Sequence, residues 1–148
     1  MPNRASHFPF VLLAALSLAG ALWAALARVG WSLPALPLPI VAQHGELMIG
    51  GFLGTLIGVE RATALGWRWT YAAPLLSGLG AIGLALGVPP PIGRGLITLG
   101  SFGLSLLFVH MYQMRPAVYV QTMGLGALAW LAGNLAWWSE RSLVVVVP

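Results

Sequence analysis

Two histidine–methionine pairs are the residues of this sequence best suited to hold a metal ion or a haem. His44 and Met48 stand four residues apart, and so do His110 and Met114. In an α-helix this spacing places both members of a pair on one face. A neutral imidazole binds haem iron, copper or zinc, and a thioether is a soft ligand for haem iron or Cu(I). The pattern therefore predicts a ligand pair at His44 and Met48, and a second one at His110 and Met114.

Each pair also has a simpler interpretation. His44 could lie at the membrane interface and hydrogen-bond a neighbouring helix, and methionine is common in membrane helices. His44 falls about five residues into its expected helix and His110 about seventeen into a parallel one, so their depths differ by roughly 18 Å. This difference argues against one haem bound axially by both histidines. His110 lies closer in depth to Glu60, with which it could hydrogen-bond.

The expected helix over residues 39–64 also contains the charged side chains Glu46, Glu60 and Arg61. A charged group at mid-bilayer costs about 3 kcal/mol or more, so each is a functional candidate. Glu46 points roughly 200° around a helix from His44, so we expect it to meet another helix or the headgroups. Glu60 and Arg61 are expected to form an interfacial charge pair at a helix end. The alternative is a proton or ion path that uses Glu46, Glu60 and His110.

The composition indicates an integral membrane protein. Hydrophobic residues make up 59% of the chain and charged residues 7%, and the mean hydropathy is +0.88. A soluble domain usually has about a quarter charged residues, because they cover its surface. The expected partner of this chain is therefore the lipid bilayer.

The residue inventory also limits the chemistry. The chain has no Cys, Lys or Asp, which excludes disulfides, thiolate metal sites and a lysine Schiff base. Its arginines are scattered, so it lacks the basic stripe of a nucleic-acid-binding protein. There is no P-loop, no Ser-His-acid set and no HExxH motif, so catalysis by side chains alone has almost no support.

Proline, glycine and arginine divide the chain into five apolar segments, each near the length of about twenty residues that crosses a bilayer. We therefore predict an all-α, polytopic transmembrane bundle that forms one domain over residues 1–148. Gly50, Gly54 and Gly58 share one face of its second helix and predict close backbone packing there. The predicted helices are residues 8–27, 39–64, 71–88, 93–113 and 117–138.

Arginine positions favour a cytoplasmic N-terminus by a small margin. With that orientation the cytoplasmic side carries Arg4, Arg61, Arg68 and Arg115, and the opposite side carries Arg28, Arg94 and Arg141. The apolar residues 142–148 end without a polar tail. They suggest that the chain is part of a longer one, or that a partner in a homo-oligomer or larger membrane complex covers them.

Several stretches of the chain resemble the N-terminal region of the NnrS-like membrane proteins, in an uncharacterised branch. The stretches are FPFVLL at 8–13, LW at 22–23, HGELMIGGFLG at 44–54, GFLGTLIGVERA at 51–62 and GALAWLAGN at 126–134. His44, Glu46, Met48 and Gly51-Phe52 match the family's H-E-M-x-x-G-F type of motif. The resemblance implies a haem- or copper-containing protein linked to nitric-oxide metabolism in bacteria.

These observations leave three hypotheses. The first is a multi-pass protein of the bacterial inner membrane that binds haem b or copper through His44 and acts in nitric-oxide or redox stress. The second is a non-catalytic helical subunit that packs against a partner through its glycine face. The third is a small proton or ion transporter.

Overall fold

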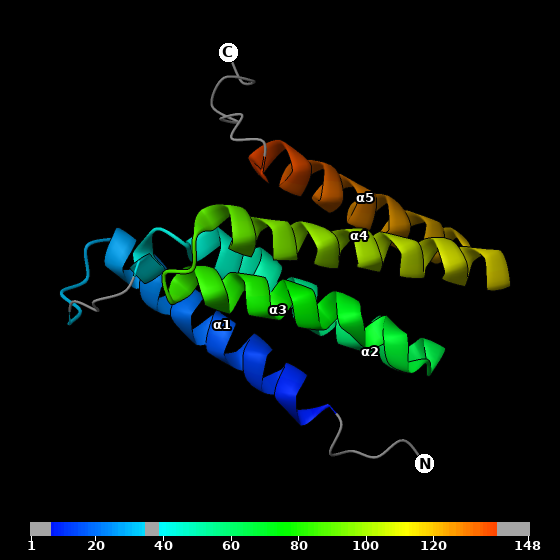
Figure 1. Cartoon of the computed structure of the whole chain (residues 1–148), viewed down its shortest axis with the longest axis horizontal. Helices are drawn as coiled ribbons and strands as arrows, with labels where there is room; N and C mark the ends of the chain where they lie inside the picture. The colour runs from blue at the N-terminus through cyan, green and yellow to red at the C-terminus, as the bar shows by residue number, and fades with distance from the viewer. Residues whose placement is uncertain (1–6, 35–38, 139–148) are drawn as a thin grey trace.

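The computed structural model describes residues 7–34 and 39–138, and this part of the chain is helical with no strand. The all-α prediction is therefore confirmed. Five main helical segments follow one another along the chain, and Figure 1 shows them as a bundle. The elements are α1 (Phe8–Arg28), η2 (Pro39–Val41), η3 (Glu46–Gly54), α2 (Thr55–Leu65), η4 (Arg68–Tyr71), α3 (Ala72–Ala85), α4 (Pro90–Met114) and α5 (Val118–Trp138).

Glycine and proline set the ends of the middle helices. Gly66 closes α2 in the left-handed conformation, with φ at +74°. Gly87, with φ at +89°, closes α3, and the amide of Val88 donates a hydrogen bond of 2.8 Å to the carbonyl oxygen of Gly83. We expected the three prolines at 89–91 to end this helix at residue 88. Instead α3 ends at Ala85, and the prolines begin α4, where a missing amide proton is tolerated.

The second predicted helix is not one regular α-helix. Residues 39–41 form a 3-10 turn, and residues 46–54 form a π-helix, η3, that continues into α2. In a π-helix each amide donates five residues back instead of four, which shifts the side-chain faces. The hydroxyl of Ser77 in α3 donates a hydrogen bond of 2.7 Å to the carbonyl oxygen of Gly50 within this segment.

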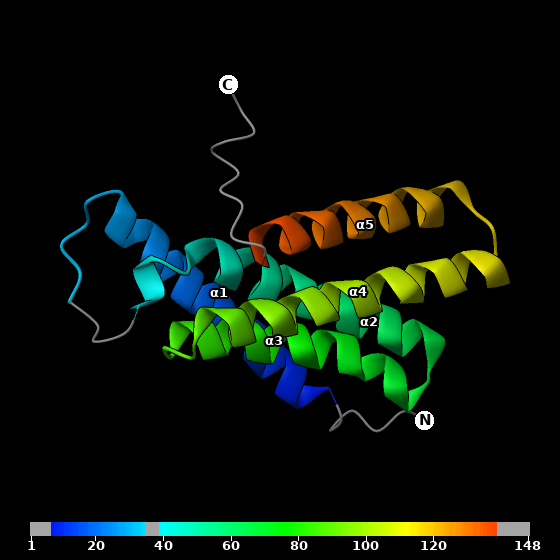
Figure 2. The same ribbon diagram turned by 45° about the horizontal axis from the view of Figure 1, so that its top comes forward.

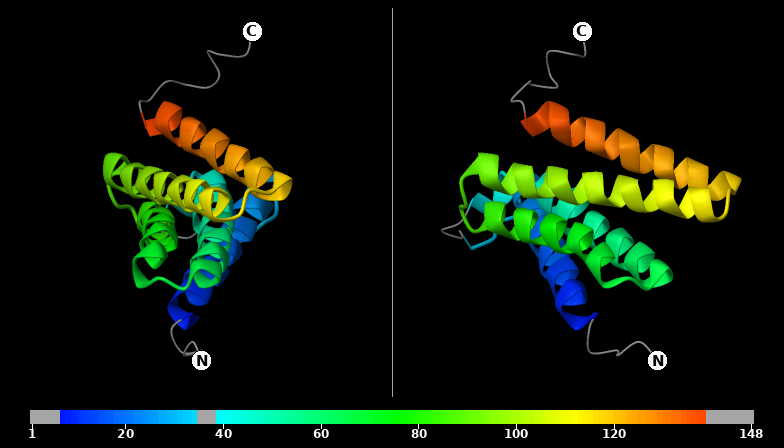
Figure 3. Two further views of the ribbon diagram at one scale, coloured as in Figure 1. Left: turned by 90° about the vertical axis from the view of Figure 1, so that its right-hand side faces the viewer. Right: turned by 45° about the vertical axis from the view of Figure 1, so that its right-hand side comes forward.

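The helices pack around η3 and α3. α1 lies against η3 and α3 on one side, and α4 lies between α3 and α5 on the other. Figure 2 shows α4 and α5 as an antiparallel hairpin. Figure 3 shows α1 and α5 on opposite sides of the bundle. α5 therefore packs mainly along α4 and leaves a face toward η3.

The distribution of side chains is the reverse of a soluble protein's. Large apolar residues cover the outside, among them Phe8 at 68% and Val118 at 80% exposure, while the buried positions are rich in small and hydroxyl-bearing residues. Membrane helices pack in this way, because small residues let backbones approach and lipid already solvates the large side chains. The buried hydroxyl groups belong to Ser17, Thr55, Thr70, Ser77, Thr98, Ser101 and Ser105.

Three of the described helical stretches are long and apolar enough to cross a membrane: Phe8–Arg28, Glu46–Leu65 and Pro90–Met114. α3 has 14 residues, fewer than the length of about twenty that a span needs. α5 has 21 residues, but its apolar sequence is interrupted by the amide side chains of Gln121 and Asn134.

Glycines allow the closest contacts of η3. A Cβ atom added at Gly51 would lie 2.4 Å from Oγ of Ser17 and 2.9 Å from Cβ of Ala81. One added at Gly54 would lie 2.5 Å from the indole of Trp130. The same atom at Gly58 would lie 2.9 Å from Pro74, and at Gly50 it would lie 3.2 Å from Ile97. η3 and α2 thus approach α1, α3, α4 and α5 through glycine.

We expect Gly51→Ala to lower the free energy of unfolding by about 1–3 kcal/mol, because its methyl group overlaps Ser17 and Ala81. Thermal unfolding of the detergent-purified protein by circular dichroism measures this loss. Gly126→Ala is the matched control. Its added Cβ meets no atom within 4 Å, and alanine favours a helix over glycine by about 1 kcal/mol. Equal melting temperatures for the two variants would contradict the prediction.

Candidate functional site

His44 is held in one tautomer by the neighbouring helix α1. Its Nδ1 lies 2.9 Å from the carbonyl oxygen of the fully buried Ala21. Since a carbonyl oxygen only accepts, the proton of the neutral ring is on Nδ1 and the lone pair is on Nε2. Within the described residues, Nε2 makes no hydrogen bond. An imidazole fixed in this way resembles metal-binding histidines, whose second nitrogen usually donates to a carbonyl or a carboxylate.

Met48 and Glu46 have different neighbours. Met48 is half-buried and packs against the apolar cluster that includes Ala21, Leu47 and Leu84. Glu46 lines a cleft on the side of η3 that faces α5. Because η3 begins at Glu46, the regular four-residue spacing that suggested a shared face for His44 and Met48 does not apply there.

His110 and Met114 lie at the other end of the bundle from His44. The ring of His110 packs on Trp67, with centroids 4.8 Å apart, and Met114 is 59% exposed. Trp67 follows the end of α2 and precedes Tyr71 by four residues. The ring centroids of Tyr71 and of His7, at the start of α1, are 5.6 Å apart, so this end of the bundle also contains the start of α1. His44 instead contacts α1 near its last turns. The described residues contain no group of three or more histidine or acidic side chains that could together hold a metal ion.

Glu60 and Arg61 form an ion pair near the end of α2. The carboxylate of Glu60 is 64% exposed, whereas the side chain of Arg61 is 14% exposed. This arrangement fits a charge pair at a helix end. Nε2 of His110 is buried and has no hydrogen-bond partner in the described part of the chain, so it does not bond Glu60.

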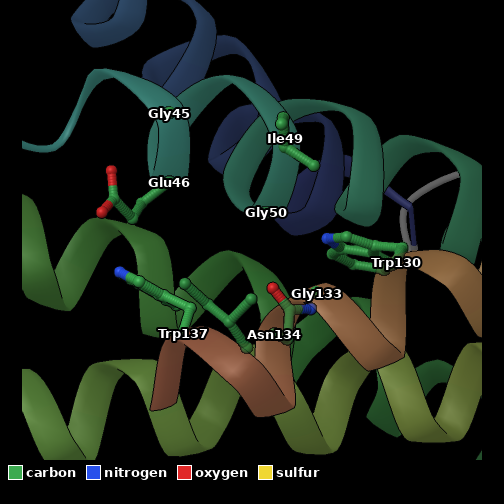
Figure 4. A pocket seen from close by; sticks show the side chains of 9 residues that line it. Gly45, Glu46, Ile49, Gly50, Trp130, Gly133, Asn134 and Trp137 are labelled. Atoms are coloured by element: carbon green, nitrogen blue, oxygen red, sulfur yellow. The ribbon is translucent and has the colours of Figure 1, made fainter. Parts of the chain in front are cut away.

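A cleft of about 330 Å³ lies between η3 and α5, and Figure 4 shows it from close by. We call it the η3–α5 cleft. Its volume is at the lower end of the range for small-molecule sites. The residues that line it are Gly45, Glu46, Ile49, Gly50, Ile97, Trp130, Gly133, Asn134 and Trp137.

Asn134 is the polar side chain in the middle of this cleft. It is 8% exposed, and its Nδ2 has no hydrogen-bond partner among the described residues. Trp137 and Trp130 lie on either side of it along α5, and Glu46 extends from η3 on the Trp137 side. The guanidinium carbon of Arg94 lies 4.6 Å from the centroid of the Trp137 ring. The cleft thus combines two aromatic walls with one unpaired amide.

A second, apolar cavity of about 270 Å³ adjoins the η3–α5 cleft along the same helix. The two share Ile49 and Trp130. The other residues that line the second cavity are Leu53, Gly54, Ile57, Leu104, Phe108, Met123, Gly126 and Ala127. We call it the tail groove, since it offers apolar contacts and no charged side chain.

The sequence-based candidates did not include Asn134, Trp130 or Trp137. All three lie in α5, which carries no acidic or basic side chain within its bounds. Asn134 could have been singled out from the sequence as an amide in a largely apolar helix, because a polar group in hydrocarbon is costly unless it is paired. Of the predicted residues, only Glu46 and Gly50 line the cleft.

The fold and the cleft define a helical-bundle protein of the membrane class with a small-molecule-sized cavity between its helices. The chain belongs to the family described as Domain of unknown function (DUF8744), which matches residues 7–148. No curated protein and no solved structure matches the chain.

We expect Asn134→Leu to raise the free energy of unfolding of the ligand-free protein by about 1–3 kcal/mol. Leucine of similar volume removes a buried amide that has no partner. Thermal unfolding measures the gain, and Gln121→Leu serves as the control because Gln121 is an exposed amide of the same helix. A lower melting temperature for Asn134→Leu than for the wild type would show that the amide is already paired.

Proposed function

We propose that this chain is a multi-pass protein of the bacterial inner membrane that binds haem b or a copper ion through Nε2 of His44. The observation that carries the proposal is the contact between Nδ1 of His44 and the carbonyl oxygen of Ala21. It assigns the ring proton to Nδ1 and directs the lone pair of Nε2 elsewhere, as ligation requires. The NnrS-like resemblance around His44 supports the same cofactors and a role in nitric-oxide or redox stress.

The residues near His44 fit a group held by a single protein imidazole. His110 and Met114 lie at the opposite end of the bundle and are not partners of His44 in one site. Met48 is the soft donor closest to it in sequence, in the segment that packs against the cluster containing Ala21. A bound haem or copper would supply one-electron chemistry or gas binding. This chain's own part is to fix the imidazole through the carbonyl oxygen of Ala21.

The proposed orientation places the N-terminus in the cytoplasm. Arg61, Arg68 and Arg115 lie at the end of the bundle formed by the last turn of α2, η4 and the end of α4. Arg28 and Arg94 lie at the other end, where Nε of Arg28 donates to the carbonyl oxygen of Val41 at 3.0 Å. The difference of one described arginine between the ends favours this orientation.

We expect the wild-type protein, purified in detergent from cells supplied with haem precursor and copper, to show a Soret band or bound copper. His44→Asn should reduce cofactor content at least tenfold. Asparagine can still donate to the carbonyl oxygen of Ala21, because its amide nitrogen takes the place of Nδ1, but it lacks an equivalent of Nε2. The variant therefore separates ligation from structural support. Optical spectra of the oxidised and reduced protein and a metal assay measure the result.

His110→Asn is the matched control, and its cofactor content should equal that of the wild type. A colourless, metal-free wild type would contradict the proposal and favour a non-catalytic subunit. If wild type and His44→Asn contain equal amounts of cofactor, His44 is not the ligand. A transporter that uses Glu46, Glu60 and His110 is instead favoured if Glu60→Gln abolishes ion flux in vesicles.

A further inference from the structure

The unpaired amide of Asn134 lacks the partner that its surroundings would normally supply. A buried donor is normally satisfied by protein, by water or by a bound molecule, because leaving it unpaired is costly. Nδ2 of Asn134 is buried and has no partner within the described residues, and the residue itself, at 8% exposure, lines a cleft large enough for a ligand. A molecule bound in the cleft would supply an acceptor for this donor.

We propose that the η3–α5 cleft binds a membrane-soluble molecule with a flat, carbonyl-bearing ring and an apolar tail, of the quinone class. The ring carbonyl would accept a hydrogen bond from Nδ2 of Asn134. Trp130 and Trp137 flank this amide along α5 and offer aromatic faces or edges to a flat ring. The carboxylate of Glu46, on the Trp137 side, accepts hydrogen bonds and would pair with a hydroxyl group on the ring rather than with a carbonyl.

The tail groove is the reason to infer an amphipathic ligand rather than a ring alone. It continues from the η3–α5 cleft past Trp130, and its lining is formed by apolar side chains and two glycines. The η3–α5 cleft is therefore an aromatic and mainly apolar site with the side chains of Asn134 and Glu46 in its lining, and the adjoining tail groove has no charged or amide side chain. An isoprenoid or alkyl chain attached to a ring carbonyl compound matches both ends.

Two glycines of α5 are suitable positions for substitutions that test the cavity. A Cβ added at Gly133 or at Gly126 meets no atom within 4 Å. Gly133 lines the η3–α5 cleft and Gly126 lines the tail groove. The first carbon of a side chain at either position would not overlap the protein, and replacing glycine would favour the helix.

The test is a titration of the full chain in nanodiscs with decylubiquinone, followed by quenching of tryptophan fluorescence. Trp130 and Trp137 stay unchanged because they report binding. We expect saturable quenching that Asn134→Leu weakens about tenfold in Kd, the effect of losing one buried hydrogen bond. Gly133→Leu should abolish the saturable phase, and Gln121→Leu should leave Kd unchanged. Melting temperatures of Asn134→Leu and Gly133→Leu at or above that of the wild type show that these variants are folded.

Tail recognition has its own readout. Gly126→Leu should weaken decylubiquinone about tenfold and leave the tail-less duroquinone unchanged, whereas decyl alcohol should not compete with either. His44→Asn should bind both quinones like the wild type, so failure of this proposal and failure of His44 ligation are distinguishable.

Three outcomes would overturn the proposal. The first is quenching that never saturates. The second is equal quenching in wild type, Asn134→Leu and Gly133→Leu, which indicates partition into lipid. The third is a dimeric wild type and a monomeric Asn134→Leu variant, as measured by light scattering, with the same quenching in both. That result would assign the partner of the amide to a second copy of the chain.

Discussion

The close approach of η3 to its neighbours is the constraint on which the rest of the structure depends. Gly51 lies against Ser17 and Ala81, and Gly54 lies against Trp130 and Ser77. Lipid solvates apolar side chains as well as a protein interior does, so helices in a bilayer gain stability mainly from close packing and interhelical hydrogen bonds. The bond from Ser77 to the carbonyl oxygen of Gly50 adds such an interaction at the same segment. A larger side chain at these glycines would separate α1, α3 and α5 from η3.

The same segment also positions the polar groups of both candidate sites. His44 precedes η3 and bonds Ala21 in α1, while Glu46, the first residue of η3, faces the cleft beside α5. Only Gly45 separates them in sequence, yet they face different helices. A π-helix alters which side chains share a face, and such segments are frequent at functional sites. η3 thus lies between an imidazole on one side of the bundle and an aromatic cleft on the other.

Much of the fold was predictable because apolar run length and proline and glycine positions are local properties. The ends of α1 and α2, at Arg28 and Leu65, each lie one residue from the predicted ends. The separation of His44 from His110 also followed from rise per residue. The π-helix was not predictable, since a glycine-rich apolar segment fits α and π hydrogen bonding alike. Nor was the η3–α5 cleft, which depends on how α5 is placed by its packing on α4.

Asn134 is where stability and a binding function oppose each other. An apolar residue at position 134 would favour burial in a bilayer. Three described stretches are apolar enough to cross a membrane, and α5, which contains Asn134 and Gln121, is not one of them. Proteins retain such locally unfavourable residues chiefly at functional sites, where the cost is offset by a ligand. The unpaired amide and the apolar tail groove lie along one helix, and a bound amphipathic molecule would account for both.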